Sequence, residues 1–214
     1  MSAAIVDYGM GNLGSVANAC GFLGMDCRIV ADPAELGRHS AVILPGVGSF
    51  GKCMQHLRAS GFVDPLRDWI DQGWPFLGIC LGLQVLFERS EESEGVAGMG
   101  VFPGSVRLFN RSSGLKVPQM GWNRVWHNHD GVRMFEGVED GSFFYFVHSF
   151  YVDTPDREIV AGSTEYGITY TSAIQCGRTM AVQFHPEKSQ SIGLAVLRNF
   201  GRMAAEYEKE RSAL

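Results

Sequence analysis

The sequence predicts an α/β fold with a central, mostly parallel sheet, helices on both faces, and an antiparallel-rich C-terminal half. Two observations predict it. In the first half, short runs that are apolar throughout alternate with helical patterns, which is typical of parallel strands buried on both faces. In the second half, strand-like segments follow one another with only turns between them, before one final helix.

The elements of the first half follow the changes in hydrophobic period along the chain. Strands are expected over residues 3–8, 27–30, 41–44 and 76–79. Helices are expected over residues 13–23, 34–38, 52–59 and 63–71. A further helical pattern begins directly after residue 79 and runs to Phe87, and a polar loop over 88–98 closes this half.

The second half is expected to contain six strands and one helix. The strands are placed over residues 101–109, 117–126, 142–148, 159–165, 169–175 and 180–184. The helix is placed over 191–207, and its charged end is expected to be solvated and frayed. Because the chain shows no internal repeat, linker or low-complexity segment, residues 1–214 are expected to form a single domain.

Composition excludes several classes of protein. A net charge of −5 gives no basic footprint for nucleic acid. No apolar run approaches the roughly 20 residues of a membrane span, and Asp7 interrupts the first apolar run, which argues against a signal peptide. Five cysteines without a CxxC spacing argue against a disulfide framework or a zinc site. We therefore expect a cytoplasmic protein.

One short stretch, Gly78-Ile79-Cys80-Leu81-Gly82, has the form of a nucleophile elbow. An apolar strand pattern meets Cys80 and passes at once into a helical pattern, with a glycine two residues to either side. A Cβ at either glycine would collide with the neighbouring strand or helix. The alternative is a structural cysteine, so the elbow needs partners elsewhere in the chain.

The best candidate for a general base is His185, in the segment Gln183-Phe184-His185-Pro186-Glu187. A thiolate nucleophile needs a base, and the base needs an orienting group. His185 ends a predicted strand, where side chains of α/β sheets face the ligand crevice. Glu187, two residues on, is placed to hold one imidazole nitrogen. The alternative is a surface turn with an incidental His-Pro pair.

Acyl transfer also needs N–H donors for the oxyanion. The N–H of Leu81 is one donor by elbow geometry. A second donor is expected from the glycine-rich loop Pro45-Gly46-Val47-Gly48-Ser49-Phe50-Gly51, which follows a predicted strand. Taken alone, this loop also fits a simple tight turn between a strand and a helix.

Two other patterns compete with this interpretation. Gly9-Met10-Gly11-Asn12-Leu13-Gly14, with Asp32 at the end of the next strand, matches a dinucleotide-binding fingerprint. That function leaves Cys80, the second glycine loop and His185 without a role. His127-Asn128-His129-Asp130 has a metal-like composition, but no third ligand is evident nearby, so no metal is expected.

Taken together, these segments resemble the class I (triad) glutamine amidotransferases, and among them the glutaminase subunits of imidazole glycerol phosphate synthases. The resemblance covers essentially the whole chain. It is carried by Asp7-Tyr8-Gly9-Met10-Gly11-Asn12-Leu13, Pro45-Gly46-Val47-Gly48-Ser49-Phe50, Gly78-Ile79-Cys80-Leu81-Gly82-Leu83-Gln84, Pro118-Gln119-Met120-Gly121-Trp122-Asn123, Tyr145-Phe146-Val147-His148-Ser149 and Phe184-His185-Pro186-Glu187-Lys188. It implies the flavodoxin-like fold of that family.

The resemblance implies that Cys80 attacks the carboxamide of L-glutamine, His185 shuttles the proton and Glu187 orients His185. Water then hydrolyses the γ-glutamyl thioester, releasing glutamate and ammonia without a cofactor. It also implies substrate contacts at a set of positions lining the same site. These are Gly46, Gly48, Gln84 and the backbone at Ser149 and Phe150.

In the family, ammonia passes to a cyclase subunit with a (β/α)8-barrel fold in a heterodimer. That subunit makes imidazole glycerol phosphate and an aminoimidazole carboxamide nucleotide in histidine biosynthesis. The resemblance places four residues at the subunit contact around the ammonia exit: Asn12, Trp122, Tyr145 and Lys188. The alternatives are a class I glutaminase serving another acceptor, and a dinucleotide-binding module with a structural Cys80.

One position departs from many class I relatives. Val47 stands where they have a further glycine or proline, and valine resists a positive φ. We therefore hypothesise that the oxyanion hole is incomplete at rest and forms only when the partner and its nucleotide are bound.

Overall fold

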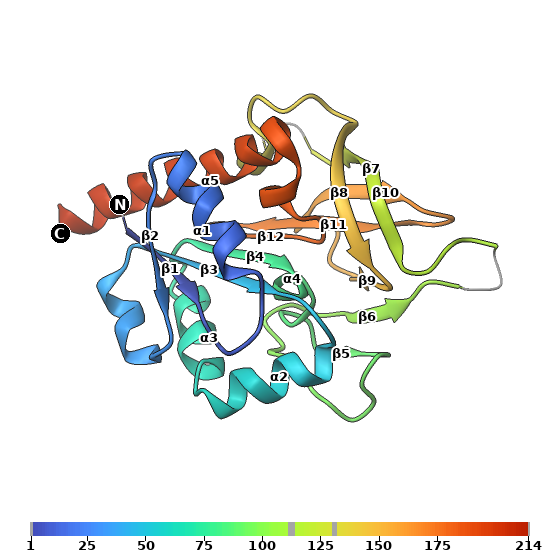
Figure 1. Ribbon diagram of the computed structural model, residues 1–214, viewed down its shortest axis with the longest axis horizontal. Coiled ribbons are helices and arrows are strands. Elements are labelled where there is room, and N and C mark those ends of the chain that lie inside the picture. The colour runs from blue at the N-terminus through green and yellow to red at the C-terminus, as the bar shows by residue number, and fades with distance from the viewer. Residues whose placement is uncertain (1, 111–113, 130–131, 214) are drawn as a thin grey trace.

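The structure, a computed structural model, describes residues 2–110, 114–129 and 132–213. A mixed sheet runs through the molecule in the order β2-β1-β3-β4-β12-β11-β10-β7-β8 (Figure 1). The alternating first half of the sequence predicts four of the parallel strands, and a fifth, β12, comes from the second half. The first five strands in this order are parallel. They are β1 (Ser2–Val6), β2 (Asp26–Val30), β3 (Ala41–Gly46), β4 (Phe76–Cys80) and β12 (Thr179–Val182).

Helices cover both faces of the parallel strands (Figure 1). On one face lie α1 (Leu13–Phe22) and α5 (Gln190–Ser212), and on the other lie α2 (Phe50–Ala59) and α3 (Val63–Asp71). Every residue of β3, β4 and β12 is buried. Side chains alternate across these strands, so the chain builds one apolar core on each face of the sheet.

The second half is antiparallel. β11 (Thr169–Cys176) pairs with β12, and β10 (Val160–Glu165), β7 (Gln119–His127) and β8 (Ser142–His148) extend the sheet from it. A branch is formed by β5 (Arg89–Ser90), β6 (Ser105–Leu108) and β9 (Phe150–Asp153). Short 3₁₀ turns are η1 (Pro33–Arg38), η3 (Arg133–Phe135) and η4 (Pro186–Lys188).

The helix after Cys80 is shorter than predicted. α4 spans only Leu81–Gln84, although the helical pattern continues to Phe87. The carbonyls of Val85 and Leu86 instead accept N–H groups from the segment 99–102, at 2.7 Å from Met99 and 2.8 Å from Val101. The same contacts explain why the predicted strand over 101–109 is reduced to β6.

Other differences lie in the second half. β5 and β9 were not predicted, and β12 ends at Val182 rather than at residue 184. The last helix continues to Ser212, and its charged end is not frayed as expected. Arg178 pairs with Glu210 and Arg133 with Glu206, so the charges of this end are anchored to the body of the fold. In the described part of the chain, no helix is both long and apolar enough to cross a membrane.

Candidate active site

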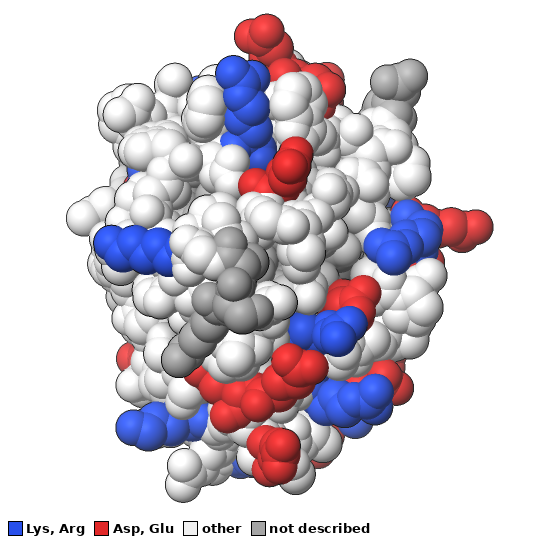
Figure 2. Space-filling view, turned by 90° about the vertical axis from the view of Figure 1, so that its right-hand side faces the viewer, with Lys and Arg blue, Asp and Glu red and all other residues white. Residues whose placement is uncertain are grey.

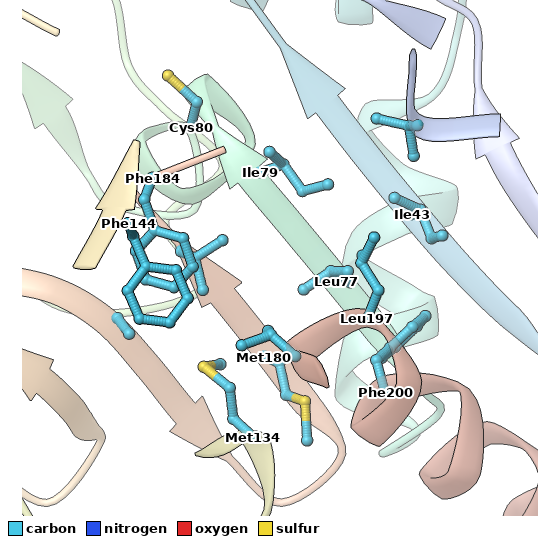
Figure 3. Packing of buried hydrophobic residues seen from close by; sticks show 14 of the residues in the cluster. Ile43, Leu77, Ile79, Cys80, Met134, Phe144, Met180, Phe184, Leu197 and Phe200 are labelled. Carbon is cyan, nitrogen blue, oxygen red and sulfur yellow. The ribbon is translucent and has the colours of Figure 1, made fainter. Parts of the chain in front are cut away.

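Cys80 lies at the junction of β4 and α4 in a strained backbone conformation, with φ of 56° and ψ of −103°. The flanking glycines make this junction possible. A Cβ at Gly82 would lie 2.0 Å from the carbonyl oxygen of Leu44, and one at Gly78 would lie 2.6 Å from the carbonyl oxygen of Gly82. In Figure 3 the Cys80 side chain turns away from the apolar cluster around Phe144 and Phe184. The sulfur is therefore presented to the opposite side, as expected for an elbow.

His185 is held firmly beside this elbow. Its Nδ1 lies 2.8 Å from Oε1 of Glu187, and both side chains are almost fully buried. Its backbone N–H donates to the carbonyl of Tyr145 at 2.9 Å, and its carbonyl accepts the Ser189 hydroxyl at 2.7 Å. The imidazole therefore has a fixed position, and among the described residues its buried Nε2 has no hydrogen bond partner. This leaves Nε2 free to exchange a proton.

The charge state of His185 follows from its neighbours. Burial disfavours the imidazolium, but the attraction of Cys80 and of Glu187 outweighs burial and raises the pKa of His185 to about 10. Near neutral pH the site therefore favours a protonated imidazole beside the Cys80 sulfur.

The loop after β3 lies against the elbow because β3 and β4 pair in parallel register, with Gly46 opposite Cys80. A Cβ on Gly46 would lie 2.8 Å from both the Tyr8 hydroxyl and the Cβ of Leu81. Gly48 takes a φ of +99°, whereas Val47 is not among the described residues with positive φ. The loop thus approaches the nucleophile closely, and glycine rather than valine adopts the unusual conformation.

A pocket of about 260 Å³ opens over Cys80 and His185. Its walls include most of the substrate and oxyanion residues expected from the sequence, namely Val47, Gly48, Leu81, Gln84, Ser149 and Phe150. Gly46 does not line it and lies behind the wall, against Tyr8. The arrangement offers a thiol, a base with its orienting carboxylate, and backbone N–H groups around one small cavity. These are the parts needed for acyl transfer from an amide.

Comparison with known proteins gives the family. The family model "Glutamine amidotransferase class-I" matches residues 4–203. The chain is a class I glutamine amidotransferase. It is 48% identical to the imidazole glycerol phosphate synthase subunit HisH of Moorella thermoacetica, over 94% of each chain. It is 43% identical to HisH of Bacillus cereus strain G9842, over 99% of each chain. The chain therefore belongs to the HisH group of this family.

Solved structures agree on the fold. PurLQS from Thermotoga maritima matches with a TM-score of 0.72 at 18% identity, covering 97% of this chain and 98% of that one. The glutaminase domain of CTPS from Trypanosoma brucei, with bound acivicin, matches with a TM-score of 0.67 at 18% identity, covering 96% and 94%. The predicted fold of class I glutamine amidotransferases is thus confirmed.

Three polar residues that line this pocket or bond to residues around it were missed in the sequence. Gln183 is fully buried, and its Nε2 lies 3.6 Å from the Cys80 sulfur. Alternation along the chain puts Gln183 on the same face as His185, and this signal was available. Glu92 lines the pocket and accepts the Phe50 N–H at 2.7 Å, but its loop carries no local pattern that indicates a site. Ser189 accepts the Tyr145 N–H at 2.9 Å and so ties β8 to the segment that carries His185.

The carbonyls of Ser149 and Phe150 are already used within the protein. Ser149 accepts the N–H of Phe109 at 3.1 Å. Phe150 accepts from Nε2 of Gln84 at 3.0 Å, and its carbonyl lies 2.7 Å from Nδ1 of His148. These two carbonyls therefore shape the pocket wall, and what this backbone can offer a ligand is its N–H groups.

The four residues expected at a subunit contact fall into two places. Asn12 is exposed and caps α1, its Oδ1 accepting the Ser15 N–H at 3.3 Å. Trp122 and Tyr145 meet edge to face at 6.0 Å, and Nζ of Lys188 lies 6.0 Å from the Tyr145 ring. Because the Tyr145 carbonyl holds the N–H of His185, this aromatic cluster is connected directly to the catalytic segment.

The competing sequence patterns have structural explanations. Asp32 caps η1, with its Oδ1 accepting the Ala34 N–H at 2.9 Å. Gly11 approaches the Pro45 carbonyl, where a Cβ would lie 3.4 Å from the oxygen. The glycine segment 9–14 therefore packs against the loop after β3. At the end of β7, His127 stacks on Phe135 at 4.4 Å, and Asp130 of the following turn lies outside the described residues.

Proposed function

We propose that this chain is the glutaminase subunit of an imidazole glycerol phosphate synthase and works in the cytoplasm as a single domain over residues 1–214. The observation that carries the proposal is the placement of Cys80, on a strained elbow, in one small pocket with the buried His185–Glu187 pair. The HisH relatives are imidazole glycerol phosphate synthase subunits, and this supports assigning the site to that enzyme.

In the first half of the reaction, the Cys80 thiolate attacks the side-chain carboxamide carbon of glutamine. The negative charge moves to the carboxamide oxygen, where the N–H of Leu81 and the loop N–H groups at Val47 and Gly48 stabilise it. His185 gives its Nε2 proton to the departing nitrogen, which leaves as ammonia. Glu187 keeps the imidazole oriented through the Nδ1 hydrogen bond.

In the second half, His185 is neutral and accepts a proton from water through Nε2. The resulting hydroxide attacks the γ-glutamyl thioester, and the Cys80 thiolate leaves as glutamate forms. The sum of both halves is glutamine plus water giving glutamate plus ammonia, with the enzyme regenerated. The residues present carry every proton and electron pair, so the mechanism invokes no metal or cofactor.

Substrate orientation is assigned to the polar wall of the pocket. Glutamine carries an α-ammonium group, and Glu92 supplies a carboxylate among the lining residues. The Nε2 group of Gln84 is occupied by Phe150 and Gln183, so its Oε1 is the atom left for the ligand. The backbone N–H groups at Ser149 and Phe150 suit the α-carboxylate. Gly46 supports the loop without touching the ligand.

The proposed partner is a cyclase subunit with a (β/α)8-barrel fold that receives the ammonia in a heterodimer. Large apolar side chains are exposed on β7 and β8, including Met120, Trp122, Trp126 and Phe143. Figure 2 shows the end of the molecule away from the two termini, with broad uncharged areas between scattered charged groups. Asn12, Trp122, Tyr145 and Lys188 are proposed to surround the ammonia exit.

The decisive experiment measures release of ammonia and glutamate by this chain alone and with a candidate cyclase subunit plus its nucleotide, with Cys80→Ala as the blank. We expect strong stimulation by the cyclase, lost in Cys80→Ala, because valine at position 47 resists the positive φ that would turn its neighbouring N–H toward the substrate. Full activity without a partner would reject the hypothesis that the oxyanion hole forms only when the partner is bound. It would also assign the glutaminase to another pathway. No activity under either condition would reject the catalytic assignment.

A further inference from the structure

Gln183 joins the nucleophile to the rest of the pocket through its side-chain amide. Its Nε2 donates toward the Cys80 sulfur at 3.6 Å, within the range of hydrogen bonds to sulfur, and its Oε1 accepts from Nε2 of Gln84 at 3.0 Å. Its side chain is fully buried. A buried amide placed against a reacting sulfur is not required for packing alone, because an apolar side chain of similar length would fill the same volume.

The orientation of this amide is fixed by its neighbours. The carbonyl of Phe150 can only accept a hydrogen bond, so Gln84 must present Nε2 to it. The second N–H of the same nitrogen points to Gln183, which must accept this hydrogen bond through its Oε1. Gln183 is then left with its NH₂ group toward Cys80. The reverse orientation would set a carbonyl oxygen against the thiolate and two NH₂ groups against each other.

We propose that Gln183 is a further catalytic residue, whose amide N–H hydrogen bonds to the Cys80 thiolate and stabilises it in both halves of the reaction. Gln84 and the Phe150 carbonyl act as positioning groups for that donor. An amide suits this role because it donates without titrating, so it holds the thiolate whether His185 is charged or neutral. The proposal rests on Cys80 being the nucleophile.

The titratable groups near Cys80 decide how its alkylation by an external reagent depends on pH. The titratable groups that act on it are Tyr8, Cys53, Tyr170 and His185. Burial raises the pKa of Tyr8 and Tyr170 above the usual range and that of Cys53 to about 12. These three stay neutral between pH 5 and about 9. His185, whose pKa is raised to about 10, is the one of the four that carries a charge in that range.

The test is the pH dependence of iodoacetamide alkylation of Cys80 in the full chain, followed peptide by peptide by mass spectrometry. In Gln183→Met, which keeps size but removes the donor, the pH midpoint should rise by about one unit, a tenfold loss of thiolate at a given pH below the midpoint. Gln84→Met, which frees the Gln183 amide to rotate, should give a smaller rise. This readout needs no turnover, so it separates the proposal from the assigned function.

Two controls belong to the same experiment. Cys176 is exposed, and its alkylation profile should be identical in every variant. Gln175→Met makes the same chemical change at a half-buried glutamine of β11 whose Oε1 accepts the Met134 N–H at 3.0 Å, and it should leave the Cys80 midpoint unmoved. An unchanged Cys80 midpoint in folded Gln183→Met would overturn the proposal.

A measurement on the unmodified protein covers the case in which Gln183→Met does not fold. The side-chain amide resonances of Gln183 should shift with the same pH midpoint as Cys80 alkylation, and the shift should vanish in Cys80→Ala. Gln183 amide resonances whose chemical shifts do not change when Cys80 ionises would also overturn the proposal.

Discussion

Replacing Gly82 with alanine tests whether the elbow depends on backbone contact between α4 and β3. The new Cβ would lie 2.0 Å from the Leu44 oxygen, whereas real Cβ contacts stay beyond 3.0 Å. Either the elbow or β3 must therefore move by about 1 Å. Overpacking of this kind costs about 1–3 kcal/mol of stability. A displacement of about 1 Å at a nucleophile costs roughly 100-fold in rate.

We expect Gly82→Ala to slow alkylation of Cys80 by a glutamine-mimicking diazoketone about 100-fold and to lower the free energy of unfolding measured in urea. The matched control is Gly21→Ala on α1, where the added Cβ meets nothing within 4 Å. This change should leave the alkylation rate unaltered and stabilise the fold by up to about 1 kcal/mol, since alanine favours the helix. A Gly82→Ala protein with the wild-type alkylation rate and stability would refute the reasoning.

The remaining predictions concern His185, His148 and Glu187. His185→Asn should abolish glutamine turnover, whereas His148→Asn should still form measurable thioester at Cys80; equal loss in both would contradict the choice of base. Glu187→Gln should lower kcat by roughly 10³–10⁴-fold and lower the pKa of His185, followed by NMR titration, because it removes the carboxylate that favours the imidazolium. Burial lowers the pKa of His148 to about 4, with the Phe150 carbonyl opposing and His185 adding to the effect. Between pH 6.5 and 4 the unfolded chain therefore binds a proton that the folded chain does not, so stability falls with acid by about 2 kcal/mol at pH 5. Urea unfolding of His148→Asn should lose this part of the slope, and parallel pH profiles would contradict it.

The catalytic trio was predictable because each member carries a local signal. Cys80 stands between two glycines, and His185 is followed by proline and by Glu187 at a distance of two residues. The parallel pairing of β3 and β4 was also implied by strands that are apolar throughout, whereas the parallel pairing of β12 with β4 was not predicted. In such a sheet the carboxyl ends of adjacent strands meet, so segments far apart in sequence converge on one pocket.

Other parts of the site had no local signal. Glu92 reaches the pocket because the loop after β5 folds over the start of α2, where its carboxylate accepts the Phe50 N–H. α4 stops after one turn because the carbonyls of Val85 and Leu86 bond to a segment about 15 residues away. Such long-range hydrogen bonds override a local helical pattern, and no window of sequence contains both partners.

By itself, the sequence determined the chemistry available: a cysteine that only a glycine-flanked turn can present, a histidine with a carboxylate in reach, and a loop able to approach them. These follow from local sterics and from hydrophobic period, which act over a few residues. Only the tertiary structure decided the environment of that chemistry. Burial and contacts between distant segments produce the Gln84–Gln183 amide pair and the raised pKa of the His185 imidazole. They also bury its Nε2, which has no hydrogen-bond partner within the described part of the chain. Desolvation and hydrogen bonding depend on what surrounds a group in space, and that is settled only when the chain has folded.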